Sequence, residues 1–259
     1  MDILDSYVRE TPSPQSVLDL FAGEWSSALP ASYGLVTKPG QAGLFEDPRV
    51  VWAGEMLGGF AGKSVLELGP LEGGHSFMCQ QRGAVRIVAI EANSRAFLKC
   101  LCIKEIFDLD RVQFKLGDFN KYLQDCTDRF DVCLASGVLY HSTDPLLSLE
   151  LMAKASKKLF LWTHYYDSKI IGSKPYLARF FGAAETREYK GRKYVAARKD
   201  YKDALDWKGF CGGLDDHAYW LTRESLMDVL RFLGFQDLRI AFDEPDHPNG
   251  PALCVSASS

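Results

Sequence analysis

The chain has 259 residues, 47% of them hydrophobic, and a formal net charge of −4. This length allows one α/β domain with an appendage, and the small net charge gives no overall argument for a polyanionic partner. No apolar run approaches the roughly 18 residues that a membrane span needs, and the acidic start MDILDSYVRE is unlike a secretory signal. We therefore expect a cytoplasmic protein without a membrane partner.

The first sixty residues contain two helical patterns, PQSVLDLFAGEW (14–25) and DPRVVWAGEML (47–57). They predict an N-terminal helical segment, residues 1–60, ahead of a main domain, residues 61–259.

From Ser64 onward, strand and helix patterns alternate along the chain. Short apolar runs predict buried strands at 64–69, 86–92, 112–118, 130–137 and 157–165. Helical patterns lie between them at 93–107, behind an Asn93 cap, and at 144–157, with Pro145 in the first turn. Alternation of this kind predicts an α/β fold, doubly wound, with helices on both faces of a parallel sheet. In the helix at 93–107 we expect the core face to consist of Phe97, Leu98, Leu101, Cys102 and Ile106.

The alternation stops after Tyr165, where an insertion of about fifty residues (167–216) follows the fifth strand. Between Lys154 and Lys202 there are thirteen Lys or Arg residues against four Asp or Glu, in a chain that is acidic overall. Aromatic residues are interleaved with the basic ones, at Tyr176, Phe180, Phe181, Tyr189, Tyr194, Tyr201, Trp207 and Phe210. A helix at 221–235, capped by Thr222 and closed at Gly234, then precedes strands at 237–244 and 252–258.

Seven cysteines stand at positions 79, 100, 102, 126, 133, 211 and 254, mostly in apolar segments. Cys100 and Cys102 are close together, but no second pair completes the spacing of a zinc site. This placement predicts reduced core cysteines and no metal site.

A glycine-rich turn follows the first predicted strand, in SVLELGPLEGGHS at 64–76. Such a turn lets a ligand approach the backbone and the start of the next helix. The middle glycine of a dinucleotide fingerprint is missing here. Two further strand ends carry suitable groups: Glu91 can accept hydrogen bonds from both ribose hydroxyls, and Asp118, followed by Phe119, can receive an adenine amino group. Each residue also has an ordinary alternative, as a turn residue, a helix cap or a loop acid.

These three elements, at three successive strand ends, resemble the motifs of the class I S-adenosylmethionine-dependent methyltransferases. The resemblance covers residues 50–165 and 218–257 and implies a Rossmann-like, seven-stranded sheet with an antiparallel final hairpin. It also implies S-adenosylmethionine as the cofactor and a set of cofactor-binding residues: Glu67, Gly69, Pro70, Gly73, His75, Glu91, Ala92, Asp118, Phe119 and Ser136. In such enzymes N-terminal segments often cover the mouth of the site, which makes Arg49 and Trp52 candidates.

One branch of that superfamily is more similar than the rest. GGHSF (73–77), GVLYHSTDPL (137–146) and WL…LGF (220–235) resemble the transfer-RNA wobble-uridine alkyltransferases, which act on a 5-hydroxyuridine oxygen. Ser142 and Thr143 stand where those enzymes have two arginines. The architecture and the placement of GVLYH therefore carry over, and the substrate does not.

Three residues are candidates for the chemistry. Methyl transfer to a heteroatom requires a positioned acceptor and often a base for the departing proton. His141 has a suitable intrinsic pKa for that base, Tyr140 could orient the acceptor, and His164 follows the fifth strand at the same edge. Packing of Tyr140 and structural hydrogen bonds of the two histidines are the alternatives.

The predicted function is methyl transfer from S-adenosylmethionine to an oxygen of a small-molecule or modified-nucleotide acceptor. The insertion could be a lid over the acceptor or an independent subdomain. If its basic residues line the acceptor mouth, with Lys190, Arg192 and Lys193 most tightly grouped, the acceptor is anionic. The alternatives are an RNA-modifying alkyltransferase, with transfer RNA as a less favoured partner, and a non-catalytic cofactor-binding sensor.

Overall fold

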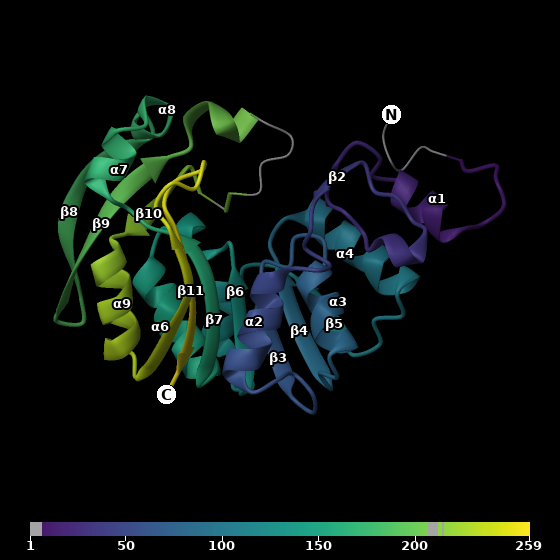
Figure 1. Ribbon diagram of the computed structural model, residues 1–259, viewed down its shortest axis with the longest axis horizontal. Coiled ribbons are helices and arrows are strands. Elements are labelled where there is room, and N and C mark those ends of the chain that lie inside the picture. The colour runs from purple at the N-terminus through teal and green to yellow at the C-terminus, as the bar shows by residue number, and fades with distance from the viewer. Residues whose placement is uncertain (1–6, 207–211, 214) are drawn as a thin grey trace.

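The structure is a computed structural model and describes residues 7–206, 212–213 and 215–259. Its centre is a seven-stranded sheet in the order β11-β12-β7-β6-β3-β4-β5, flanked by helices (Figure 1). Within this sheet the pairs β5–β4, β4–β3, β3–β6 and β6–β7 are parallel, whereas β12 is antiparallel to both β7 and β11. The predicted α/β fold with an antiparallel final hairpin is confirmed. The strands are β3 Ser64–Leu68, β4 Arg86–Glu91, β5 Val112–Leu116, β6 Val132–Ser136, β7 Lys158–His164, β11 Asp237–Glu244 and β12 Ala252–Ser258.

Helices cover both faces of this sheet, so the central strands are buried on both sides. In β3, Val65 and Leu66 are both fully buried, yet they belong to different hydrophobic clusters because successive side chains point to opposite faces. Buried side chains of α2 (Pro48–Leu57), α3 (Gly74–Gln81) and α4 (Ser94–Ile106) join one cluster. Those of α5 (Phe119–Asp125), α6 (Pro145–Ala155) and α9 (Arg223–Phe232) join the other. This double cover explains why the strands read as continuous apolar runs.

The expected core face of α4 is wrong in part. Leu98 and Leu101 are 46% and 39% exposed, and the buried side chains are those of Ala96, Lys99, Cys100 and Ile103. Apolar residues surround most of this helix, so their spacing does not single out one face. The ammonium group of Lys99 is drawn inward by Glu72, whose Oε1 lies 3.0 Å from Nζ.

The N-terminal segment contains helices and a small parallel sheet. Its elements before α2 are α1 Pro14–Asp19, β1 Trp25–Ser27, the 3-10 turn η2 Ala31–Tyr33 and β2 Pro39–Ala42. The carboxylate of Glu72, which is fully buried, accepts hydrogen bonds from the backbone N–H groups of Ser26 (3.0 Å) and Ser27 (2.8 Å). These bonds attach β1 to the glycine-rich turn after β3.

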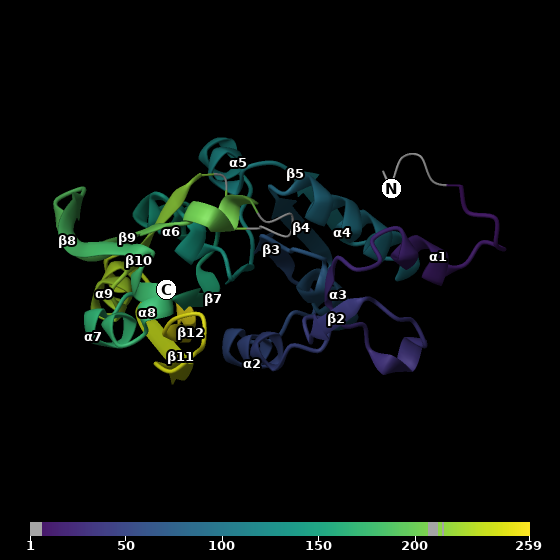
Figure 2. The same ribbon diagram turned by 90° about the horizontal axis from the view of Figure 1, so that it is seen from above.

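The insertion after β7 contains a second, antiparallel sheet of order β10-β9-β8. Its elements are α7 Ser168–Gly172, α8 Pro175–Ala178, β8 Phe181–Tyr189, β9 Arg192–Asp200, the 3-10 turn η4 Lys202–Asp206 and β10 His217–Leu221. Figures 1 and 2 both show the β8–β9 hairpin and α1 at opposite ends of the molecule, with the central sheet between them. The predicted contributions of Trp207 and Phe210 lie outside the described residues.

The cysteines in the described part of the chain are free. Cys79, Cys100, Cys133 and Cys254 are buried, while Cys102 and Cys126 are partly buried. Cys211 lies outside the described residues. Among the residues that the structure describes, no helix combines the length and the apolar character that crossing a membrane requires.

Candidate active site

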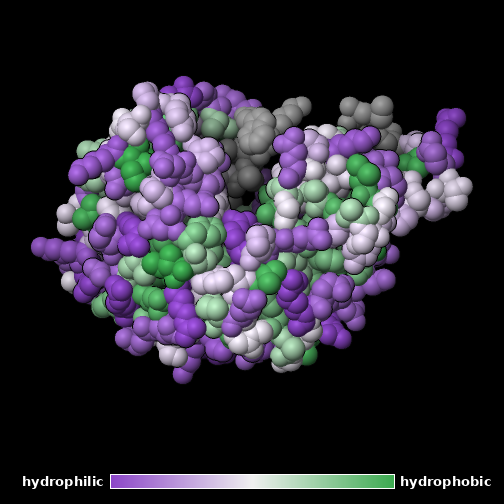
Figure 3. All heavy atoms as spheres, viewed as in Figure 1, coloured by the Kyte–Doolittle hydropathy of each residue, from purple (hydrophilic) through white to green (hydrophobic). Residues whose placement is uncertain are grey.

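A cavity of about 660 Å³ opens at the carboxyl ends of the parallel strands. In Figure 3 the surface is hollowed between the part built by the insertion and the part built by the N-terminal segment. Most of the predicted site residues meet on its wall, although they come from four different strand ends: Gly69, Pro70, His75, Glu91, Ala92, Asp118, Phe119, Ser136, Tyr140 and His141. Glu67, Gly73 and His164 do not line it.

Gly69 allows the turn after β3 to approach the segment after β6. Its φ is +64°, and a Cβ at this position would lie 2.5 Å from Cγ1 of Val138. A larger residue would therefore clash with the GVLYH segment. Gly73, at φ +79°, is the residue that precedes α3. Gly69 thus lets two segments that line the cavity meet, and Gly73 supplies the left-handed backbone conformation before α3.

Glu91 ends β4 and ties two loops together. Its Oε2 accepts a hydrogen bond from the backbone N–H of Leu71 (3.0 Å), and its Oε1 accepts one from that of Asn93 (2.8 Å). Burial raises the pKa of Glu91, while these backbone hydrogen bonds act in the opposite direction. An ionised carboxylate has about four acceptor positions, and Glu91 lines the cavity, so its carboxylate can also accept a hydrogen bond from a ligand hydroxyl.

Asp118 and Asn120 shape the wall after β5. Oδ1 of Asp118 caps α5 by accepting from the backbone N–H of Asn120 at 2.8 Å. The amide of Asn120 donates to Oγ of Ser148 (3.1 Å), and its own buried Oδ1 has no partner in the described part of the chain. Sequence reasoning missed Asn120, because an asparagine after a strand is also an ordinary turn residue.

A series of polar contacts connects the N-terminal segment with buried residues near the glycine turn. Oδ2 of Asp47 lies 2.9 Å from Nε2 of His75, and both Asp47 oxygens accept from the guanidinium of Arg49. Burial raises the pKa of Asp47, but the hydrogen bonds from His75 and Arg49 outweigh burial and hold this pKa far below its usual range. Glu67 is buried behind His75, with its Oε1 3.9 Å from Nδ1, and burial raises its pKa.

GVLYH forms the wall after β6, as a 3-10 turn at Leu139–His141. Nδ1 of His141 lies 2.7 Å from the hydroxyl of Tyr201, which belongs to the insertion. Burial, assisted by the positive charge of Lys199, lowers the pKa of His141 to about 3. The ring is therefore neutral near pH 7 and can accept a hydrogen bond or a proton, although it is a weaker base than a free imidazole.

His164 lies behind that wall. Its Nδ1 donates to the carbonyl oxygen of Gly250 at 2.9 Å, and its ring stacks on Trp220 with a centroid distance of 5.0 Å. Burial lowers the pKa of His164 to about 4. Its ring also contacts Tyr140 at a centroid distance of 4.6 Å, so its position suits support of the tyrosine. Direct participation of His164 in the reaction stays a prediction.

Trp162 of β7 is a wall residue that the sequence did not reveal, because an apolar residue in a strand pattern looks like core. The guanidinium carbon of Arg49 lies 4.7 Å from the centroid of its ring, and both residues line the cavity. Arg49, named as a candidate from sequence, is thus placed at the site, whereas Trp52 packs against the hydrophobic core. Ser142 and Thr143 also line the cavity.

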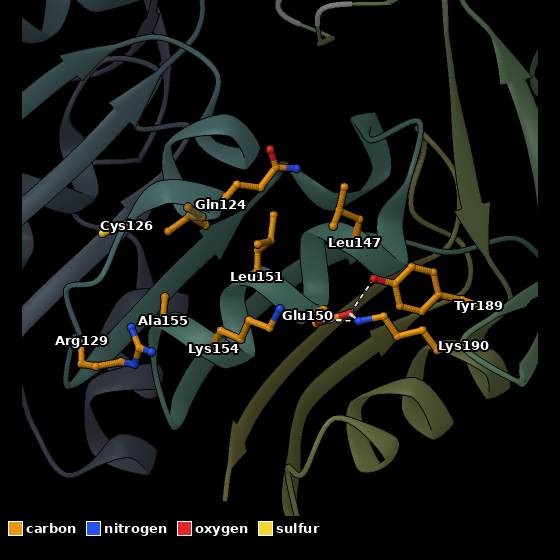
Figure 4. A pocket seen from close by; sticks show the side chains of 11 residues that line it. Gln124, Cys126, Arg129, Leu147, Glu150, Leu151, Lys154, Ala155, Tyr189 and Lys190 are labelled. Carbon is orange, nitrogen blue, oxygen red and sulfur yellow. Dashed lines mark hydrogen bonds and ion pairs between the residues drawn. The ribbon is translucent and has the colours of Figure 1, made fainter.

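The basic residues at the tip of the β8–β9 hairpin lie elsewhere. Nζ of Lys190 is 2.7 Å from the Glu150 carboxylate, and Nη2 of Arg192 is 3.8 Å from that of Asp228. Figure 4 shows Lys190 and Tyr189 converging on Glu150 beside a separate cavity of about 350 Å³. Neither Lys190 nor Arg192 lines the candidate active-site cavity, so these two residues do not support the alternative in which the basic cluster lines the acceptor mouth. Local attraction to acids on α6 and α9 explains their position.

The sheet order, with β12 antiparallel to both β7 and β11, is that of the class I S-adenosylmethionine-dependent methyltransferase fold. Residues 60–179 match a family model described as a methyltransferase domain. The predicted superfamily and the predicted cofactor, S-adenosylmethionine, both agree with this fold and with this family model. No curated protein matches the sequence.

Solved structures of methyltransferases share this fold. The N-terminal domain of EvdMO1 with bound SAH is 22% identical, with a TM-score of 0.60 over 82% of this chain and 81% of that one. Magnesium protoporphyrin IX methyltransferase (ChlM) from Synechocystis PCC 6803, also with SAH, is 16% identical, with a TM-score of 0.54 over 82% and 80% of the two chains. A Burkholderia thailandensis enzyme, 1,6-didemethyltoxoflavin-N1-methyltransferase, is 15% identical, with a TM-score of 0.53 over 84% and 78%.

Proposed function

We propose that the protein transfers a methyl group from S-adenosylmethionine to an oxygen of a small-molecule acceptor. The observation that carries this proposal is that Gly69, Glu91 and Asp118, from three strand ends, line the same cavity as Tyr140 and His141. Two of the similar structures were obtained with small molecules, one in the presence of D-fucose and one with bound 1,6-didemethyltoxoflavin. They support a small acceptor as the class to test first.

The residues of the cavity suit this cofactor. A volume of about 660 Å³ lies within the range of ligand sites, roughly 300–1,000 Å³. Glu91 retains acceptor capacity for ribose hydroxyls, and Asp118 and the unpaired Oδ1 of Asn120 are acceptors for an amino group. Gly69 keeps the turn free of a side chain where the backbone must be approached. Of the remaining predicted residues, Glu67 and Gly73 would act indirectly, by supporting His75 and the turn.

The cofactor supplies an activated methyl group on a positively charged sulfur. The residues of this chain have to place the acceptor oxygen in line with that methyl group and to receive the hydroxyl proton. Tyr140 and Trp162 provide aromatic surface for positioning an acceptor, at a ring-centroid distance of 5.9 Å from each other. His141 is neutral and can accept the proton, while its contact with Tyr201 fixes the ring.

Calorimetry with S-adenosylmethionine and its demethylated product, followed by transfer of a labelled methyl group into fractionated small-molecule and RNA pools, tests the proposal. We expect a dissociation constant of micromolar or tighter, corresponding to about −8 kcal/mol, and label in a small-molecule fraction. Absence of binding by the folded protein would refute the cofactor assignment. Binding without transfer into any pool would favour a non-catalytic sensor.

The second candidate is an RNA-modifying alkyltransferase acting on a wobble-type hydroxyuridine. It is favoured by the GVLYH segment, which forms part of the cavity wall. This function predicts label in the transfer-RNA fraction and binding that weakens steeply with salt. The pairing of Lys190 and Arg192 with acids of the same chain weakens the electrostatic argument for it.

A further inference from the structure

Arg49 is held in a fixed orientation on the cavity wall by groups on two sides. The Asp47 carboxylate accepts hydrogen bonds from Nε of Arg49 (2.9 Å to Oδ1) and from Nη2 of Arg49 (2.6 Å to Oδ2). This bidentate contact engages one edge of the guanidinium. The ring of Trp162 lies below the guanidinium at 4.7 Å. Asp47 is itself nearly inaccessible, with 4% of its side chain exposed, and is held from the other side by His75. A long, mobile side chain is thereby ordered before any ligand arrives.

One edge of this guanidinium remains available. Arginine has five N–H donors, and Asp47 engages those on Nε and one on Nη2. The edge formed by Nη1 and the second N–H of Nη2 makes no hydrogen bond within the described residues. Arg49 lines the cavity with 21% of its side chain exposed, so these remaining donors belong to a residue that borders the ligand space. A pair of parallel N–H donors matches the two oxygens of a carboxylate.

The position of Arg49 relative to the glycine turn is also fixed. Gly74, the first residue of α3, packs against the segment just before Asp47: a Cβ there would lie 2.6 Å from the carbonyl oxygen of Leu44. Leu44, Arg49 and His75 line the same cavity as Gly69. Arg49 and the aromatic ring of Trp162 therefore line the same cavity as the glycine turn.

We propose that Arg49 binds a carboxylate group of the ligand in this cavity through its available edge. The carboxylate belongs either to the amino-acid part of the cofactor or to the acceptor, and the experiment below separates these two sources. The inference rests on the proposed function and adds to it one specific contact. It also assigns a binding role to the N-terminal segment, which lies outside the matched methyltransferase domain at 60–179.

Calorimetry on the purified full chain tests this contact without requiring turnover. The wild type and Arg49→Gln are titrated with S-adenosylhomocysteine and with 5′-methylthioadenosine, which has the adenosine and the sulfur but no carboxylate. The same two proteins, saturated with S-adenosylhomocysteine, are titrated with benzoate and with benzamide as its neutral counterpart. Arg231→Gln, which removes an exposed arginine paired with Asp228, is the matched control, and melting temperatures verify folding.

If the carboxylate is that of the cofactor, Arg49→Gln weakens S-adenosylhomocysteine binding about 10- to 100-fold and leaves 5′-methylthioadenosine unchanged. If it is that of the acceptor, S-adenosylhomocysteine binding is unchanged and benzoate binding is lost, while benzamide binds as before. In either case Arg49→Lys recovers only part of the affinity, because a lysine offers a charge without the paired donors.

Three results would overturn the inference. The first is an Arg49→Gln protein that binds S-adenosylhomocysteine like the wild type, with no Arg49-dependent binding of benzoate. The second is an equal loss for S-adenosylhomocysteine and 5′-methylthioadenosine, which would make Arg49 a structural residue. The third is full recovery by Arg49→Lys. Failure of the wild type to bind S-adenosylhomocysteine at all would instead overturn the proposed function, so the two failures are distinguishable.

Discussion

Glu91 combines structural hydrogen bonds with a proposed role in cofactor binding. Its carboxylate accepts from the N–H groups of Leu71 and Asn93, so it joins the turn after β3 to the end of β4. The same group lies on the cavity wall. An alanine at this position removes both acceptor oxygens, whereas a glutamine keeps the shape and one acceptor oxygen.

We therefore expect Glu91→Ala to weaken S-adenosylhomocysteine binding about 10- to 100-fold, because charge-assisted hydrogen bonds contribute about 1.5–3 kcal/mol each. Glu91→Gln should lose less. Calorimetry gives both affinities, and melting curves separate loss of fold from loss of contact. Unchanged affinity in a folded Glu91→Ala protein would remove Glu91 from the cofactor site.

His141 gives a prediction about pH as well as rate. If it receives the acceptor proton, His141→Ala should lower turnover by about two to four orders of magnitude and leave cofactor affinity within a few fold. Because its pKa is about 3, the wild-type ring stays unprotonated throughout the neutral range. The pH profile of kcat/KM should then show no histidine titration between pH 6 and 8. A limb near pH 6.5 that disappears in the alanine variant would contradict the buried, neutral ring, and near-normal turnover of the variant would make His141 structural.

At the scale of elements, the tip of the β8–β9 hairpin is attached to α6 by one carboxylate. The Glu150 carboxylate accepts hydrogen bonds from the hydroxyl of Tyr189 (2.5 Å) and from Nζ of Lys190, and it also pairs with Lys154 (2.7 Å). These hydrogen bonds lower the pKa of Glu150 to about 2. The positive charge of Lys190 therefore helps to hold the hairpin tip against α6.

Lys190→Glu should consequently destabilise the protein by about 1 kcal/mol, or about 2–4 °C in melting temperature, because it places like charges together. Lys193→Gln is the control on the same hairpin, since Lys193 is exposed and lies opposite Glu188, where a glutamate would itself place like charges together. Neither change should alter cofactor affinity or the KM of an acceptor found by the transfer assay. A raised KM with unaltered stability would return the cluster to the acceptor mouth.

At the scale of the whole molecule, buried neutral histidines make stability depend on pH. His141 and His164 have pKa values of about 3 and about 4 in the folded protein, against 6.5 in the unfolded chain. Between those values the unfolded state binds more protons, so this stabilisation is complete above pH 6.5 and is lost as the pH falls toward 4. Glu67 and Glu91, whose pKa values are raised by burial, act in the opposite direction.

Urea unfolding at several pH values between 7.5 and 5 isolates the contribution of one histidine to the pH dependence of the unfolding free energy. Each such histidine adds a slope of up to about 1.4 kcal/mol per pH unit near pH 5. His164→Asn should reduce the slope of the unfolding free energy against pH by that amount, whatever it does to stability at pH 7.5. An identical slope in the two proteins would show that His164 is accessible to protons in the folded state.

The sequence by itself determined the fold class of this protein. Continuous apolar runs, the caps at Asn93 and Thr222 and the first-turn Pro145 follow from local backbone chemistry and burial on both faces. They predict the strands, the helices and the doubly wound sheet. The positions of Glu91 and Asp118 at strand ends predict the binding edge for the same reason, since carboxyl ends of parallel strands meet at one edge.

The tertiary structure alone decided which side chains face one another. The ion pair of Lys190 with Glu150 joins residues far apart in sequence. The buried face of α4 and the hydrogen bonds of Arg49 to Asp47 depend on side-chain orientation, which residue spacing does not encode. Trp162 and His164 read alike as strand residues, yet one lines the cavity and the other packs behind it. Orientation of this kind is set by packing between elements, where contact energies and charge pairing choose among faces that the sequence leaves equivalent.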